Sequence, residues 1–185
     1  RRRLRSLVGH LVVDAAPGPV LELLAERRAD GYAMNVNLLG EAVLGDEEAE
    51  RRFERTLALI DDPEVDYVSV KVSAVAAQLN MWAFEDTLAR IEDRLRVLFR
   101  RAAVAHTPSG RPTFVNLDME EHRDLELTIR AFTDMLDEPE LKDLDAGIVL
   151  QAYLPDAFPA LQRITAWASA RRDAGGGEGK VRLVK

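Results

Sequence analysis

The sequence predicts an α/β fold, a (β/α)8 TIM barrel of which an N-terminal portion of about five strands is present. Short apolar runs recur along the chain, and an amphipathic segment with helical periodicity follows most of them. The clearest runs are Tyr67–Ser73, Thr113–Asp118, Gly147–Tyr153 and Lys180–Lys185. Each run carries a polar residue within it or just after it. Since barrel active sites lie at the carboxyl ends of the strands, the first candidate site residues are Lys71, Asp118, Gln151 and Lys185.

The length of the chain sets how much of a barrel it can hold. The chain has 185 residues, whereas a complete eight-stranded barrel usually needs about 250. We therefore expect residues 1–30 to form an N-terminal helical segment that leads into the barrel, and residues 31–185 to form a partial barrel.

The first part of the chain predicts two helices and a strand. Ser6–Ala15 reads as a short apolar helix, although Gly9 and the paired valines leave a strand open. Pro19–Asp30 reads as a helix, because proline suits a first helical position and Gly31 a helix stop. The first strand is then Tyr32–Leu39. Glu41, just after the break at Gly40, is placed at the barrel mouth.

The second unit begins at Asp46, a good helix N-cap. The apolar residues of this helix recur at spacings of three and four, at Ala49, Phe53, Leu57 and Ile60. Strand Tyr67–Ser73 follows, then a longer loop that shapes a pocket rim, and then a helix from about Ala83 to Ala105.

The remaining elements follow the same rhythm. A turn at 107–112 precedes the Asp118 strand, and a helix with Leu125, Ile129, Phe132 and Leu136 on one face comes next. Strand Gly147–Tyr153 leads into a helix that starts at Pro155-Asp156 and runs to Arg172. Gly175–Gly179 is expected to be a flexible link before the fifth strand. Repeats of roughly 30 to 45 residues suit parallel strands, which only a crossover can join.

Composition excludes several classes of function. The net charge of −7 and the pI of about 5.1 leave no basic patch for nucleic acid. The absence of cysteine excludes disulfides, thiolate nucleophiles and Cys-ligated zinc. No apolar run reaches the length of a membrane span and the chain does not open on a signal core, so we expect a soluble, cytoplasmic protein.

Charged residues interrupt three of the apolar strands, at Lys71, Asp118 and Arg182. A charge inside a buried strand costs several kcal/mol unless it is paired or faces a wet cavity. One such residue is explained equally well by an ion pair inside the wall. Several at matching strand ends favour a site that holds a carboxylate-bearing substrate and a polar ring system.

Two other readings stay open at this stage. Asp118, Glu120 and Glu121 could form a magnesium or manganese site, which would indicate a metal-dependent barrel lyase or aldolase using Asp118 and Glu120. Against this, Glu120 and Glu121 could begin a solvent-facing loop. The chain could also be a non-catalytic structural fragment with open strand edges. The three histidines lack ligand spacing to one another, and His122 reads as a surface residue.

Five ordered segments resemble one known family: NVNLLGEAVLGD, YVSVKVSAV, FVNLDMEE, GIVLQAYLPD and KVRLVK. In this order and spacing they are similar to the proline dehydrogenase barrel of the bifunctional proline utilization A flavoenzymes. The resemblance implies FAD-dependent oxidation of L-proline to 1-pyrroline-5-carboxylate, the first step of its conversion to glutamate, with electrons passed to a membrane quinone. It further implies an aldehyde dehydrogenase domain elsewhere in the polypeptide, peripheral membrane contact and a homo-oligomer.

The resemblance also implies roles for individual residues. Lys71 corresponds to a lysine that binds the proline carboxylate, and Glu41 to a glutamate that gates the site. Asp118 corresponds to an aspartate beneath substrate and flavin, with Met119 beside the cofactor. Three residues correspond to flavin contacts: Gln151 at the isoalloxazine edge, Arg182 near N5, and Lys185 on the ribityl-phosphate side. No metal is implied.

Two features depart from the family pattern. Asn37 stands where the family commonly has an aspartate, so a charge role there is in doubt. The sequence ends at RLVK, where the family continues with three more strands and a helix whose paired arginines clamp the substrate carboxylate. We therefore expect the 185-residue chain alone to have little activity.

Overall fold

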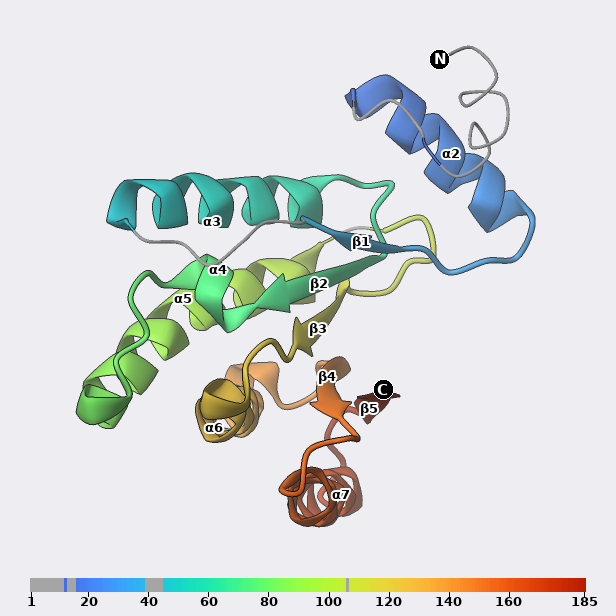
Figure 1. Cartoon of the computed structure of the whole chain (residues 1–185). Coiled ribbons are helices and arrows are strands. Elements are labelled where there is room, and N and C mark those ends of the chain that lie inside the picture. Colours follow the sequence, from blue (N-terminus) through green and yellow to red (C-terminus); the bar gives the residue numbers. More distant parts are fainter. Residues whose placement is uncertain (1–11, 13–15, 39–44, 106) are drawn as a thin grey trace. The chain divides into compact units, whose positions relative to one another are not determined.

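The computed structural model describes residues 12, 16–38, 45–105 and 107–185 (Figure 1). Two compact units contain them, residues 1–34 and residues 35–185. The second unit holds all the strands of the described chain.

The first unit is built on helix α2, Pro17–Ala29. Its end shows why the sequence signal at Gly31 is informative. Gly31 adopts a φ of +86°, and the amide of Tyr32 donates to the carbonyl of Arg27, so the last turn closes on a glycine in the left-handed region. The predicted helix Ser6–Ala15 lies outside the described residues except for Val12.

The second unit is a parallel sheet in which strand order follows chain order, β1-β2-β3-β4-β5. Its strands are β1 Asn35–Asn37, β2 Tyr67–Lys71, β3 Phe114–Asp118, β4 Ala146–Gln151 and β5 Gly179–Val184. Every strand pairs in parallel with the next strand along the chain, which is the strand order of a β/α barrel.

Helices connect the strands and pack on one side of the sheet (Figure 1). The long ones are α3 Asp46–Asp61, α5 Phe84–Val104, α6 Leu125–Leu136 and α7 Ala157–Asp173. Short ones are α4 Val72–Val75, η1 Met81–Ala83, η2 His122–Asp124 and η3 Pro139–Leu141. The predicted apolar face of α5 is buried, with Ile91, Leu95 and Leu98 all at 0% exposure.

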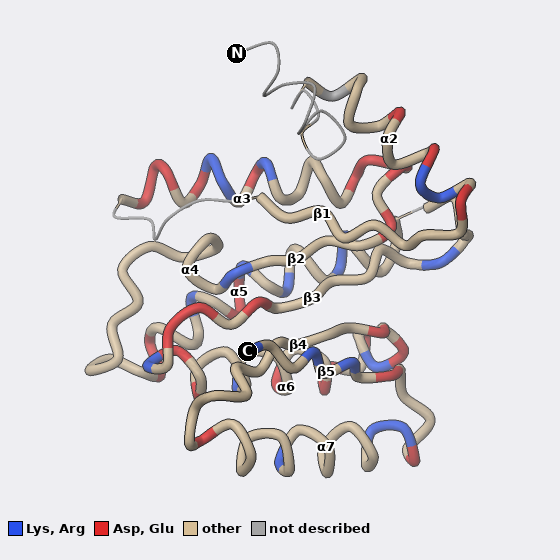
Figure 2. The backbone as a smooth tube through the Cα atoms, turned by 45° about the vertical axis from the view of Figure 1, so that its right-hand side comes forward, with Lys and Arg blue, Asp and Glu red and all other residues tan. Residues whose placement is uncertain are grey.

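The two faces of the sheet differ sharply in polarity. Because side chains alternate along a strand, strand pairing assigns each residue to one face. The outer face is apolar: Val36, Val68, Val70, Val115, Leu117, Ala146, Ile148, Leu150, Val181 and Leu183. The helices cover it except at the end of β5, where Leu183 is 54% exposed. The inner face is largely polar: Asn35, Asn37, Tyr67, Ser69, Lys71, Phe114, Asn116, Asp118, Gly147, Val149, Gln151, Lys180, Arg182 and Val184. Figure 2 accordingly shows charged residues on β2, β3 and β5 as well as on the helices.

Several element boundaries differ from the sequence prediction; β4, for example, ends at Gln151 rather than at Tyr153. The first strand covers only Asn35–Asn37 rather than the longer predicted run. β2 ends at Lys71, because the next residues form the single turn α4, which buries Val72 and Val75. Asp46 is the first residue of α3 rather than its cap, and Gly45 takes the extended N-cap position.

The glycine run before β5 packs closely, so the prediction of a flexible link is wrong. A Cβ on Gly177 would lie 2.6 Å from the carbonyl oxygen of Leu144, and one on Gly176 would lie 3.0 Å from that of Lys142. Gly177 also accepts a hydrogen bond from Nε of Arg171. These glycines therefore permit close backbone contact rather than movement.

Candidate active site

The carboxylate of Asp118 is the centre of a hydrogen-bond network at the carboxyl end of β3. Its Oδ1 accepts from Arg182 Nη2 at 2.7 Å, from Asn116 Nδ2 at 2.8 Å and from Ser69 Oγ at 3.2 Å. Its Oδ2 accepts from Asn37 Nδ2 at 3.2 Å. Four strands thus supply the carboxylate and its donors, and the side chain of Asp118 is 12% exposed.

Local sequence explains why these groups meet. Asn116 and Asp118 are two residues apart on β3, so both lie on the inner face, and Ser69 pairs with Asn116 across the sheet. Asn116 is fully buried, and Gly147 opposite leaves room for it: a Cβ there would lie 2.5 Å from Asn116 Oδ1.

Asn37 contributes a donor that an aspartate could not provide. Its amide donates to Asp118 Oδ2, and the amide of Asn35 donates to Ser69 Oγ at 2.8 Å. An aspartate at position 37 would place two carboxylates within hydrogen-bond distance. The asparagine therefore stabilises the charge of Asp118 without adding a second one.

Lys71 lies on the same face at the carboxyl end of β2, but its partner is a different acid. Its Nζ is 2.7 Å from Glu120 Oε1, and the two side chains are 20% and 23% exposed. Ser73 donates to the other oxygen of Glu120. Gln151 Nε2 donates to the main-chain carbonyl of Glu120 at 3.0 Å.

Several buried polar atoms of the inner face have no hydrogen-bond partner within the described part of the chain. They are Asn35 Oδ1, the Tyr67 hydroxyl, Asn116 Oδ1, Gln151 Oε1 and Arg182 Nε. Buried polar groups are nearly always satisfied in native proteins, so this concentration marks a surface built to meet a polar ligand or ordered water.

The structure brings most of the predicted site residues onto this face. Asp118 and Arg182 form an ion pair, and Lys71 and Gln151 both contact Glu120. Met119 follows β3 and is buried, while Lys185 follows β5 and is exposed. Glu41 lies outside the described residues.

Sequence reasoning missed the residues that hold the network together: Ser69, Asn116 and the pairing role of Glu120. For Ser69 and Asn116 the available signal was their spacing of two residues from Lys71 and Asp118, which puts all four on one face. The Glu120 contact carried no such signal, because Glu120 lies beyond the end of β3.

A metal centre is not supported in the part of the chain that the structure describes. No group of three or more His, Cys, Asp or Glu side chains there is arranged to hold a metal ion. Glu120 is paired with Lys71. His122 is exposed, as predicted, and its Nε2 lies 2.7 Å from Asp156 Oδ2. Burial raises the pKa of neighbouring Asp124, and Glu121 raises it further.

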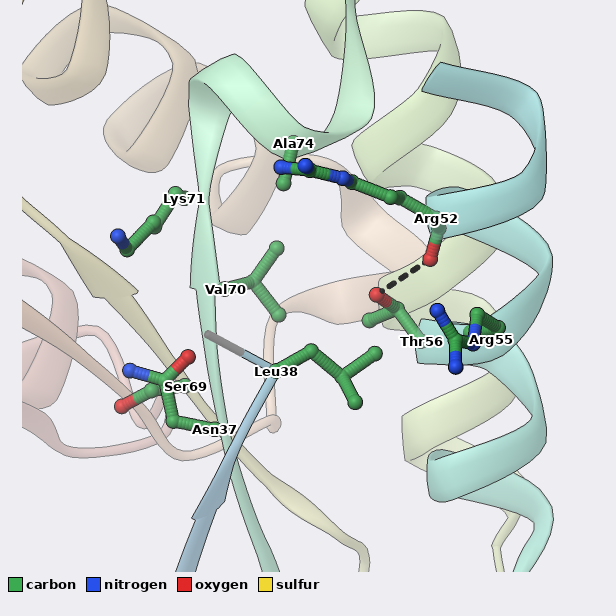
Figure 3. A pocket seen from close by; sticks show the side chains of 9 residues that line it. All are labelled: Asn37, Leu38, Arg52, Arg55, Thr56, Ser69, Val70, Lys71 and Ala74. Atoms are coloured by element: carbon green, nitrogen blue, oxygen red, sulfur yellow. Dashed lines mark hydrogen bonds between the residues drawn. The ribbon is translucent and has the colours of Figure 1, made fainter. Parts of the chain in front are cut away.

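A cavity of about 140 Å³ lies on the other side of β2, between the sheet and helix α3. Figure 3 shows Leu38 and Val70 on the side of the sheet that faces α3, and Thr56 and Arg55 of α3 line the cavity opposite them. Lys71 points away from α3. Asn37 and Ser69 also line the cavity, so it borders the Asp118 network, to which both side chains donate.

Comparison with known proteins identifies the family. The profile of the proline dehydrogenase family matches residues 20–185. The chain belongs to the proline dehydrogenase family. A comparison with curated proteins found no match. The predicted fold class is confirmed: the parallel sheet is part of a TIM-barrel-type proline dehydrogenase domain.

Solved structures of proline utilization A proteins resemble this proline dehydrogenase family chain. The protein from Corynebacterium freiburgense is 52% identical with a TM-score of 0.88, over 99% of this chain and 19% of that chain. The protein from Bdellovibrio bacteriovorus, inactivated by N-propargylglycine, is 31% identical with a TM-score of 0.79, over 92% of this chain and 19% of that chain. A D778Y mutant from Bradyrhizobium japonicum is 25% identical with a TM-score of 0.69, over 83% and 16%. The chain thus spans about a fifth of the length of the first two.

Proposed function

We propose that this chain is part of an FAD-dependent dehydrogenase that oxidises L-proline to 1-pyrroline-5-carboxylate. Family membership and the likeness to proline utilization A proteins support the substrate. The observation that carries the proposal is the composition of the inner face. It combines the ammonium group of Lys71, which can bind a carboxylate, with the ion pair of Asp118 and Arg182 and with buried polar atoms that have no partner in the described part of the chain.

The polar atoms of β4 and β5 fit the edge of a flavin ring. Gln151 Oε1 is a buried acceptor suited to the N3–H donor of a flavin, and Arg182 Nε is a buried donor suited to N5 or O4. When bound, FAD would accept the hydride that proline loses, and with it the two electrons of the oxidation. A guanidinium on this face stabilises the negative charge that builds up on reduction.

The remaining residues act on the substrate or on other parts of the cofactor. Lys71 binds the proline carboxylate, and Glu41 contributes to substrate binding. Asp118 keeps Arg182 oriented and lies beneath the substrate. Met119 packs beside the cofactor and Lys185 binds its ribityl-phosphate side. Oxidation removes a hydride from the ring carbon beside nitrogen and a proton from nitrogen, which leaves a C=N bond. Rigid strand ends suit this reaction, because hydride transfer needs a fixed distance of about 3 to 3.5 Å.

The wider assignment follows from the resemblance to the bifunctional flavoenzymes. We place this chain in a cytoplasmic homo-oligomer that passes electrons to a membrane quinone through peripheral contact. A separate aldehyde dehydrogenase domain would complete the conversion to glutamate. Among the described helices, none is long and apolar enough to cross a bilayer.

The deciding experiment uses the purified full-length protein under anaerobic conditions. We expect a flavin absorbance band at about 450 nm that L-proline bleaches, since the cofactor takes the electrons. N-propargylglycine, which like proline carries a carboxylate beside a secondary amine, should inactivate the enzyme in the presence of flavin. A protein without flavin, whose activity is instead abolished by a divalent-metal chelator, would replace this proposal with the lyase reading.

A further inference from the structure

Glu120 is held in place as firmly as the residues of the Asp118 network. Its carboxylate contacts Lys71 through one oxygen and Ser73 through the other, and Gln151 fixes its main chain. These contacts come from β2, α4 and β4. The neighbouring acid, Glu121, is different: its carboxylate pairs at 2.7 Å with Arg123, and both side chains are about half exposed, at 49% and 61%.

We propose that Glu120 sets the charge preference of the carboxylate site by competing with ligand for Lys71. The proposal rests on the proposed function, because it assumes that Lys71 receives the substrate carboxylate. Glu120 weakens the binding of any carboxylate and disfavours most strongly a ligand that carries two. The substrate class is therefore amino acids with a single carboxylate.

Electrostatics gives the reason. An ammonium group has three N–H donors, and Glu120 occupies one of those of Lys71, so a ligand carboxylate can still bind to the others. That carboxylate approaches a nearly neutral pair rather than a lone cation, and like charges in a partly buried site repel. A second carboxylate on the ligand feels the same repulsion, with Asp118 also on this face. The amine of a zwitterionic amino acid is tolerated.

The test measures ligand binding to the full-length protein by calorimetry, with Glu120→Gln as the main variant. Glutamine keeps an oxygen that can accept from Lys71, and its NH2 group can donate to Ser73 Oγ in place of the bond that Ser73 now donates, so both contacts can persist while the charge is removed. The probes are cyclopentanecarboxylate, which has one carboxylate and no amine, and glutarate, which has two. We expect the first to bind about tenfold more tightly and glutarate to gain by a larger factor, as expected when a neighbouring like charge is lost.

Two further variants make the result specific. Glu121→Gln should change neither affinity by more than about twofold, because its charge faces Arg123. In a Lys71→Met background, both the Glu120 and the Glu120→Gln protein should bind cyclopentanecarboxylate more weakly than the parent that retains Lys71, since the cation that receives the carboxylate is then absent.

The proposal is overturned if Glu120→Gln leaves both affinities unchanged or weakens them, or if it binds neither probe. A weaker affinity would mean that Glu120 supports Lys71 instead of competing with the ligand. The flavin spectrum and proline bleaching of the same wild-type sample report on the proposed function separately. A flavin-free protein would therefore be recognised as a failure of the function, whatever the charge effect.

Discussion

At the scale of single residues, the site is organised by donors around Asp118. A buried carboxylate is stable when several donors face it, and Asp118 has donors from β1, β2, β3 and β5. Arg182 is the only one of these donors that carries charge. It is also the more exposed partner, with 38% of its side chain accessible against 12% for Asp118. Arg182 therefore has both an internal partner and a surface to offer a ligand.

The first prediction concerns Arg182→Met in the full-length enzyme. Methionine keeps much of the length and removes the charge, so the flavin reduction potential should fall and reduction by proline should slow. The melting temperature of the apoprotein should change little. Three neutral donors remain on Asp118, so the buried carboxylate stays hydrogen-bonded when the guanidinium is lost.

Lys180→Met is the matched control for this variant. Lys180 lies on the same strand and face, but its ammonium stacks on the rings of Tyr67 and Phe114, at 4.9 and 5.7 Å. Its loss should leave the potential unchanged. If Arg182→Met unfolds the apoprotein while residual holoenzyme keeps its normal potential, Arg182 is only an internal ion-pair residue.

At the scale of elements, a single buried arginine joins the end of α6, the turn before β4 and the glycine run before β5. Arg171 Nη2 donates to the carbonyls of Leu141 and Leu144 at 2.9 and 3.0 Å, and Nη1 donates to that of Leu136. Its Nε donates to Gly177, and its guanidinium lies 5.7 Å from the ring centre of Trp167. Burial lowers the pKa of this guanidinium. These bonds position the start of β5, and hence Arg182.

The second prediction is that Arg171→Met weakens the packing between the end of α6, the turn before β4 and the glycine run before β5. The variant removes the Arg171 donors from the buried carbonyls of Leu136 and Leu144, whereas the carbonyl of Leu141 keeps the amide of Leu144. Each carbonyl left unpaired costs about 1–3 kcal/mol, so the local free energy of opening should fall by about 3 kcal/mol or more. Hydrogen exchange of residues 137–146 and 175–180 in the full-length protein should accelerate about 100-fold.

Arg172→Met provides the comparison, because the neighbouring arginine is 68% exposed and lies 4.0 Å from Asp173. Its exchange rates should match those of the wild type, since an exposed pair of this kind contributes within about 0.5 kcal/mol. Equal protection of these residues from hydrogen exchange in the two variants would show that Arg171 does not stabilise the contacts between α6, the turn before β4 and the glycine run.

At the scale of the whole molecule, the described sheet is a wall with two free edges and an open polar face. β1 and β5 each have one neighbour, and the inner face carries the site residues. A closed barrel covers such a face and abolishes such edges.

The third prediction follows from this openness. The 185-residue polypeptide produced alone, with FAD added, should show little or no proline-dependent dye reduction, because five strands do not enclose a flavin and its substrate. The full-length enzyme, assayed under the same conditions, serves as the reference. Turnover near the reference value would show that the described wall suffices for catalysis.

The sequence by itself determined the fold class and the order of the strands, and it located the carboxyl end of each strand to within about two residues. Strands and helices have different periods, and five runs each punctuated by a polar residue mark where a parallel sheet presents its carboxyl ends. The same signal located Lys71, Asp118, Gln151 and Arg182, since each interrupts or ends an apolar strand.

Only the tertiary structure decided which of these residues are partners. The Asp118 to Arg182 contact joins residues 64 positions apart and the Asn37 to Asp118 contact residues 81 apart, so no local pattern encodes them. The pairing of Lys71 with Glu120 depends on the path of the loop after β3. The need for glycine at positions 176 and 177 depends on the main-chain carbonyls of Lys142 and Leu144, which lie close to them. Local chemistry thus fixes where a polar group can stand, while strand register and loop geometry fix what it meets.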